Sequence, residues 1–350
     1  MKKERISVIL IFALFFTARV FAEESDHDHQ FFVRIGAKNG TVNPAESDED
    51  LAVISALGVN RRAGGLKPVI SVIPEHSYRC PGMPLFGCGG IPVLVEFSYF
   101  FRNGPGFLFS TDLPLRTQFY TSVNTPSQAE IQSGSAYTKY SFHTERKDYG
   151  IQYLFLPHGR VRLSPFLLRS DYRRDYQLSQ HTYYAFSNGD SAYYLGFSRR
   201  NLETSGWKAG LLSEFMILER LFVSFRFAFS ELRGTNDERG SLSAPPDFLA
   251  TLGRTGENPV SLFQTSSGVR IPGAEYTLGA RFRLISGLWI SLDYQEGLFR
   301  RNESGGSYVS TAMTAGDFIA TNAIYRQIHS AHSFNERERF ARGFVEYRYD

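Results

Sequence analysis

Ser141, His143 and Glu145 place a hydroxyl, an imidazole and a carboxylate within one short stretch of sequence. Their spacing of two puts all three side chains on one face of an extended segment. A histidine that takes the serine proton, and is itself oriented by a carboxylate, would give an activated hydroxyl nucleophile. The same residues also fit the polar end of a strand that enters a loop, and we favour this second interpretation.

Two groups of histidines raise the question of a metal site. Residues 26–29 read Asp-His-Asp-His, and His329 and His332 precede Glu336 towards the other end of the chain. Histidines in loops without a fixed scaffold are usually solvated, so we expect no metal site. No glycine-rich phosphate-binding loop leads into a helix pattern, and we therefore expect no cofactor.

The composition excludes several classes of protein. The 350 residues carry 38 Lys and Arg against 35 Asp and Glu, and this balance of +3 does not indicate a nucleic-acid partner. Two cysteines are too few for a Cys-rich zinc or iron–sulfur protein. Aromatic residues reach 15%, with 31 Phe and 19 Tyr, so a large share of the hydrophobic residues is aromatic.

The N-terminus has the pattern of a secretory signal peptide. Three basic residues precede an apolar run at 6–16, and a small-residue cleavage pattern follows at 20–22. The run is shorter than the roughly 20 residues that a spanning helix needs. We therefore expect a signal peptide at 1–22, a short tail at 23–30 and a single domain at 31–350.

Cys80 and Cys88 flank the segment PGMPLFG, whose prolines and glycines favour turns. Such turns would bring the two sulfurs together, and an exported chain meets an oxidising compartment. The sequence therefore predicts a disulfide that closes this loop.

Apolar side chains occupy alternate positions in segment after segment of the mature chain. Between residues 91 and 102 the odd positions are Ile, Val, Phe and Tyr, while the even ones include Glu96, Ser98 and Arg102. The same alternation is clear at 221–230, 288–295 and 341–349, and weaker at 31–38, 107–120, 149–156, 161–170, 207–217 and 276–284. These segments predict about ten strands, each near the length of a tilted membrane strand.

A further pair of segments, 182–187 and 191–198, is joined by Asn-Gly-Asp and could raise the number to twelve. We place this pair in a loop, because its tyrosines fall on both parities and specify no apolar face.

Short and long connections alternate along the chain. The expected tight turns are at 103–106, 157–160, 218–220 and 285–287, and the long polar segments at 39–90, 121–144, 175–204, 231–275 and 300–337. In an up-and-down membrane barrel, short turns lie at one rim and long loops at the other. A soluble sandwich has no reason to sort its loops in this way.

Together these features resemble the outer-membrane β-barrel proteins of Gram-negative-type bacteria, over essentially the whole chain from Phe31 to Tyr349. The hairpin AGLLSEFMILERLFVSFRFAFS looks like the family's down-strand, tight turn and up-strand, and GFVEYRY looks like its closing strand. Asp350 departs from the pattern, since such chains usually end on an aromatic residue. The resemblance implies an all-β, antiparallel transmembrane barrel with short periplasmic turns and long extracellular loops.

The resemblance also implies partners and invites comparison with enzymes. The partners would be outer-membrane lipid, with periplasmic chaperones and the barrel-assembly machinery during biogenesis. Four residues in one expected loop lack the spacing of the acidic and histidine pairs of omptin-type proteases: Asp171, Asp175, His181 and Asp190. Lipid-A deacylases use His and Ser on a lipid-facing strand, but here the serine precedes the histidine.

The face opposite the apolar one would gather acids and bases inside the barrel. They are Glu96, Arg102, Asp112, Arg116, Asp148, Arg162, Glu214, Arg226, Arg281, Arg283, Asp293, Arg342, Glu346 and Arg348. Side chains of both signs can pair across a lumen, and about ten strands leave little free bore. We favour a lumen that is occluded, or narrow, over an open one.

The sequence therefore predicts a monomeric barrel integral to the outer membrane, with large surface loops and a structural role or loop-mediated contact with an extracellular ligand. The alternatives are a narrow porin-like channel for small solutes and a barrel hydrolase that acts on lipid or peptide.

Overall fold

The computed structural model describes residues 29–43, 93–101, 104–125, 131–155, 160–186, 189, 191–243, 260–310 and 333–349. Ten strands run through these ranges: β1 (His29–Asn43), β2 (Val93–Phe101), β3 (Pro105–Thr125), β4 (Ile131–Tyr153), β5 (Val161–Phe186), β6 (Ser191–Leu218), β7 (Leu221–Ser243), β8 (Val260–Ile285), β9 (Leu288–Ser310) and β10 (Ser333–Tyr349). Within these ranges, no helix is long and apolar enough to cross a lipid bilayer.

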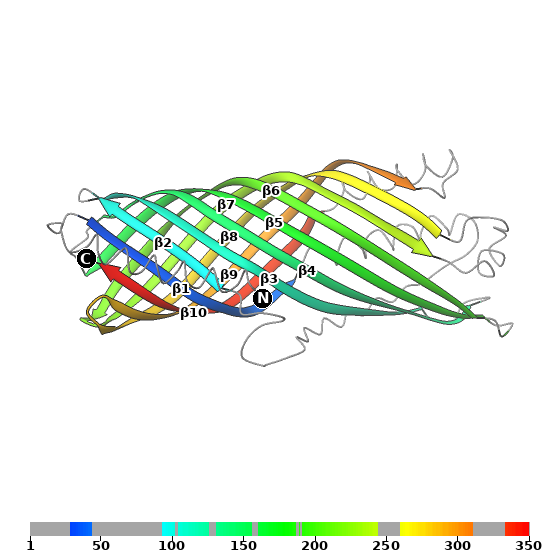
Figure 1. Cartoon of the computed structure of the whole chain (residues 1–350), viewed down its shortest axis with the longest axis horizontal. Helices are drawn as coiled ribbons and strands as arrows, with labels where there is room; N and C mark the ends of the chain where they lie inside the picture. Colours follow the sequence, from blue (N-terminus) through cyan, green and yellow to red (C-terminus); the bar gives the residue numbers. More distant parts are fainter. Residues whose placement is uncertain are drawn as a thin grey trace, which may run out of the picture.

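The strands form one closed antiparallel barrel (Figure 1). Each strand pairs with its neighbours in sequence, and β1 pairs with β10, with Phe31 opposite Tyr349 and Asn43 opposite Arg337. Closure gives both edge strands a hydrogen-bonding partner, so the sheet has no free edge. The predicted up-and-down topology is confirmed, with ten strands instead of the alternative twelve.

Several strands are much longer than the sequence predicted. β5 and β6 run to 26 and 28 residues, and they absorb most of the expected loop at 175–204. The segments at 182–187 and 191–198 are therefore the far ends of β5 and β6, and they make no extra hairpin. The expected loops at 121–144, 231–275 and 300–337 are also shortened, because β4, β7, β8, β9 and β10 extend into them. These extensions mix polar and apolar side chains on both faces, with Leu202 inside and Phe197 outside, so the period-two signal is lost there.

The barrel wall has an apolar outer face and a polar inner one. Val345 is 52% exposed on the outside, whereas the next residue, Glu346, is fully buried inside. The outer face presents large apolar side chains on every strand from β2 to β10, among them Phe97, Phe109, Ile151, Leu167, Leu211, Phe225, Leu278, Leu292 and Val345. We call this surface the apolar wall. Its extent far exceeds the exposed apolar patches of soluble proteins.

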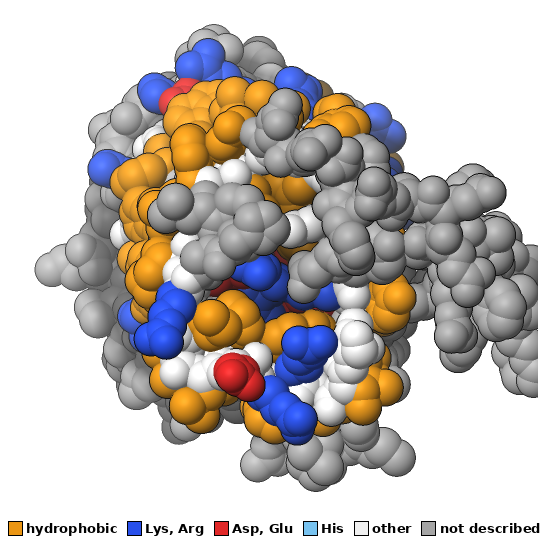
Figure 2. Space-filling view, turned by 90° about the vertical axis from the view of Figure 1, so that its left-hand side faces the viewer, with side chains coloured by type: hydrophobic (Ala, Val, Ile, Leu, Met, Phe, Trp, Pro, Cys, Tyr) orange, Lys and Arg blue, Asp and Glu red, His pale blue; other side chains and the backbone are white. Residues whose placement is uncertain are grey.

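At one end of the barrel, the outer and the inner faces of the wall are both visible. In Figure 2, hydrophobic side chains surround the rim, while Lys, Arg, Asp and Glu side chains fill the centre. Tight turns join β6 to β7 and β8 to β9, at 219–220 and 286–287, as predicted. The apolar-out, polar-in arrangement is the reverse of a water-soluble domain.

Candidate functional site

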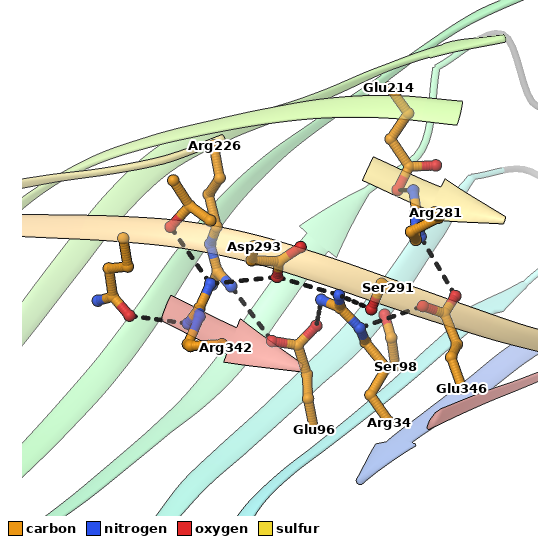
Figure 3. Close-up of polar contacts among 12 residues, drawn as sticks. Arg34, Glu96, Ser98, Glu214, Arg226, Arg281, Ser291, Asp293, Arg342 and Glu346 are labelled. Atoms are coloured by element: carbon orange, nitrogen blue, oxygen red, sulfur yellow. Dashed lines mark hydrogen bonds and ion pairs between the residues drawn. The ribbon is translucent and has the colours of Figure 1, made fainter. Parts of the chain in front are cut away.

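The lumen contains a cluster of buried ion pairs centred on Arg34 of β1 (Figure 3). Its guanidinium lies 3.5 Å from Glu96, 3.1 Å from Asp293 and 3.1 Å from Glu346, and it donates a 2.9 Å hydrogen bond to Ser291. A planar guanidinium has five N–H donors, so one arginine can serve several carboxylates. Arg34 thereby links β1 to β2, β9 and β10 from within the barrel.

Glu96 also forms an ion pair with an arginine from the opposite wall of the barrel. Arg226 of β7 lies 3.3 Å from Glu96 of β2 (Figure 3). In the closed ring, β2 and β7 are five strands apart in either direction, so this contact spans the full width of the lumen. Their side chains therefore bridge the lumen at this height.

A second contact between opposite walls lies further from the tight turns. Arg174 of β5 makes two hydrogen bonds to the carboxylate of Glu336 on β10, one of them 2.7 Å long. β5 and β10 are again five strands apart around the ring. Arg174 is completely buried, and Glu338 lies 3.8 Å from it. The lumen is thus bridged at two separate heights.

Between these two bridges, Lys208 holds two carboxylates together. Its ammonium lies 2.9 Å from Asp148 and 2.8 Å from Glu275, and Arg146 pairs with the same two acids. Ser170 donates a further 2.6 Å hydrogen bond to Asp148. A polar cavity of about 40 Å³ adjoins these residues, which is room for only a few water molecules.

Near the tight turns, two arginines and two glutamates form a compact group. Arg281 pairs with Glu214 and lies 3.2 Å from Glu346. Arg348 lies 3.4 Å from Glu214 and 2.8 Å from Glu346. Each charge therefore has two partners of opposite sign, which offsets the desolvation cost of burying it.

Aromatic rings fill the space between the charges. Arg34 stacks 4.3 Å from the ring centre of Phe344, Arg226 lies 4.6 Å from that of Phe166, and Lys38 stacks on Phe340. A cation over a ring face is attracted by the ring's quadrupole. The rings therefore stabilise the cations within the lumen.

Gly279 of β8 makes room for one of the central carboxylates. A Cβ atom at this position would lie 2.2 Å from Oδ1 of Asp293 and 2.8 Å from the hydroxyl of Ser224. The absent side chain therefore lets Asp293 reach Arg34 and Arg342, which lie 3.1 and 3.3 Å from it.

The structure places most of the predicted lumen residues in these contacts. Those in ion pairs are Glu96, Asp112, Asp148, Glu214, Arg226, Arg281, Asp293, Arg342, Glu346 and Arg348. Arg162 and Arg283 lie over the rings of Phe222 and Trp289. Arg102 lies outside the described residues, and Arg116 lies on β3 with a side chain that is not described.

Several central residues were missed from the sequence: Arg34, Lys38, Arg146, Arg174, Lys208, Glu275 and Glu336. Arg34 and Lys208 stand at inward positions of strands that were predicted, so parity alone could have found them. Arg174 and Glu336 lie beyond the predicted strands, so the sequence did not indicate whether their side chains face the lumen.

The candidate nucleophile lies on the opposite face from the lumen. Ser141, His143 and Glu145 share the outward parity of Tyr149 on β4, and Glu145 pairs with Lys147 at 2.9 Å. His143 stands opposite Asp175 of β5 in the strand register.

Three of the four residues compared with omptin proteases were assigned to a loop, but they lie on strand β5: Asp171, Asp175 and His181. The remaining one, Asp190, lies outside the described residues, as do Cys80, Cys88, His329 and His332. Among the residues that are described, no three His, Cys, Asp or Glu side chains are grouped to hold a metal ion.

Comparison with known proteins gives a likeness of architecture. No protein-family model and no curated protein matches the sequence. Among solved structures, the outer-membrane protease OmpT from Escherichia coli is 9% identical with a TM-score of 0.46, covering 92% of this chain and 97% of that one. The Pseudomonas putida toluene transporter TodX is 8% identical with a TM-score of 0.25, covering 93% and 91%. The monoaromatic hydrocarbon channel CymD is 8% identical with a TM-score of 0.22, covering 93% and 90%.

The barrel fold itself rests on the strand pairing of this chain, a closed ring of ten described strands. Identities and scores this low carry no argument about activity, which must come from the residues of this chain.

Proposed function

We propose that the protein is an integral barrel of a bacterial outer membrane, exported by the signal peptide at 1–22, with a lumen closed by its own ion pairs. Its role would be structural, or to carry surface loops that contact an extracellular ligand. The observation that carries this proposal is the contact of Arg226 with Glu96 across the full width of the barrel.

The apolar wall supports the membrane location. Side chains such as Leu292 and Ile151, which are 68% and 57% exposed, would be costly in water and favourable in hydrocarbon. Fractionation of cells that express the full chain tests this location. We expect the mature protein in the outer-membrane fraction, released only by detergent. A mature protein that stays soluble without amphiphiles would overturn the proposal.

Conductance in planar bilayers tests the closed lumen. We expect the wild-type barrel to give no steady unitary current, because opposite-wall ion pairs block it at two heights. Removing both bridging arginines, with Arg174→Ala and Arg226→Ala, should produce steady current steps. The matched control removes two outward arginines, with Arg169→Ala and Arg173→Ala, and should remain silent.

Two results of this experiment would contradict the proposal. Large, steady steps from the wild-type protein would favour the porin-like channel for small solutes. A silent lumen variant that is folded would show that something other than these ion pairs closes the barrel. Folding of each variant can be checked by the heat-dependent shift of its band on a gel.

The loop-mediated role is tested separately from the lumen. Protease treatment of whole cells should cleave the protein within the connections that follow β3, β7 and β9, which leave the rim opposite the tight turns. Cleavage restricted to lysed cells would contradict surface exposure. We also propose that the barrel is monomeric, which light scattering of the detergent-solubilised protein can measure.

A further inference from the structure

Above the apolar wall, the outer face of β7 to β10 carries a group of arginines that we call the arginine sector. It consists of Arg233, Arg270, Arg300, Arg337 and Arg339 together with two glutamates, Glu231 and Glu296. The outer face of β4 to β6 differs at similar positions, where three cations, Lys147, Arg169 and Arg173, stand among four acids, Glu145, Asp171, Asp175 and Glu203. Among these residues, positive charge is therefore in excess on β7 to β10 and not on β4 to β6.

In the arginine sector each glutamate is shared by two arginines. Glu296 pairs with Arg337 and Arg339, and its side chain is 5% exposed, whereas the arginines are 49% and 45% exposed. Glu231 pairs in the same way with Arg233 and Arg270. One carboxylate neutralises one of two guanidiniums and aligns both. Each trio therefore presents a net positive charge on the outer face, where its arginine side chains are 45% to 72% exposed.

Directly below Arg339, the outer face of β10 has small residues in place of bulky ones. Ala341 and Gly343 are the next two outward positions, and Ala37 of β1 lies opposite Gly343. A Cβ atom on Gly343 would approach only the side chain of Leu292, at 3.7 Å, so the surface there is open. The result is a shallow apolar strip that leads from the arginines down the wall.

We infer that the sector around Arg337 and Arg339 binds the phosphorylated headgroup of a membrane lipid, with an acyl chain of that lipid along Ala341 and Gly343. This inference rests on the proposed membrane location. Guanidiniums recognise phosphate oxygens through paired hydrogen bonds, and such contacts are stronger at a membrane surface than in bulk water. A soluble anion would need the arginines alone, whereas the apolar strip beneath them fits an amphiphile.

Lipid binding to the full mature barrel, measured by native mass spectrometry, tests the inference. The probes are phosphatidic acid, which carries a phosphomonoester, and phosphatidylcholine with the same acyl chains. We expect the wild-type barrel to bind phosphatidic acid at least tenfold more tightly. The variant with Arg337→Gln and Arg339→Gln should lose this preference, while the matched variant with Arg169→Gln and Arg173→Gln should keep it within twofold.

A third variant separates the headgroup from the acyl chain. Gly343→Leu fills the apolar strip without touching the arginines, and should weaken binding of phosphatidic acid several-fold. Inorganic phosphate at millimolar concentration should not displace the lipid from the wild-type barrel.

Three results would overturn the inference: no preference for phosphatidic acid, equal losses in the two double variants, or full displacement by inorganic phosphate. A barrel that inserts into membranes yet shows any of these contradicts the lipid site alone. A mature chain that needs no detergent contradicts the proposed membrane location as well.

Discussion

Arg34 in the lumen and Arg173 on the outer face each contact carboxylates from neighbouring strands, but their surroundings differ. The side chain of Arg34 is 11% exposed, and three acids lie within 3.5 Å of it. Arg173 is 52% exposed, and its contacts to Asp175 and Glu203 are both 3.6 Å long. Burial removes the water that would otherwise replace a lost partner. The same pair of residue types should therefore matter for stability inside the barrel and scarcely at all outside it.

The largest effect is expected from Arg34→Met. The change leaves Glu96, Asp293 and Glu346 buried beside fewer cations, and breaking a buried pair from one side typically costs about 3–5 kcal/mol of unfolding free energy. Urea unfolding in phospholipid vesicles, followed by tryptophan fluorescence, measures this loss. A cost under about 1 kcal/mol, typical of exposed pairs, would remove the distinction between the two regions.

A smaller effect is expected from Gly279→Val, which changes no charge. The added side chain would displace Asp293 from Arg34 and Arg342, and overpacking of this kind costs about 1–3 kcal/mol. Fluorescence of Trp289, whose ring lies inside the lumen, should shift in the same unfolding experiment. The control is Ala280→Val, at the neighbouring outward position, which should leave stability almost unchanged. Equal effects of the two valines would show that the lumen tolerates rearrangement around Asp293.

The smallest effect is expected from Arg173→Gln on the outer face. Exposed ion pairs contribute under about 1 kcal/mol, and salt screens them further. Stability measured at low and high salt should differ little between this variant and the wild type. A loss as large as that of Arg34→Met would mean that the outer pairs are shielded from water by something not present in the isolated barrel.

The sequence was informative wherever the two faces of a strand meet different surroundings. In β2 and β7 the alternation assigned Glu96 and Arg226 to the lumen, because hydrocarbon on one side demands apolar side chains there. Beyond the apolar wall, both faces of β5 and β6 carry polar residues, and the strand ends could not be found. A period-two pattern needs two faces of different polarity, and these extensions mix polar and apolar residues on both faces.

Partners within the lumen were beyond reach from the sequence. Arg226 and Glu96 are 130 residues apart, and neither local sequence indicates that the two side chains make contact. Their meeting depends on the number of strands and on the register of every pair between them. Arg174 and Glu336 depend in addition on strand extensions that the sequence did not predict. Which residues face inward is a local property, whereas which of them meet is a property of the closed ring.

The seam between β1 and β10 has a consequence for the order of assembly. Arg34 comes from the first strand and Glu346 from the last, so one of the central ion pairs joins the two ends of the chain. Until the C-terminal strand arrives, Arg34 lacks two of its three acids, Asp293 and Glu346, and the first strand has one unpaired edge. Closing the ring and completing the contacts of Arg34 therefore depend on the same strand, and a chain cut short before β10 would lose both together.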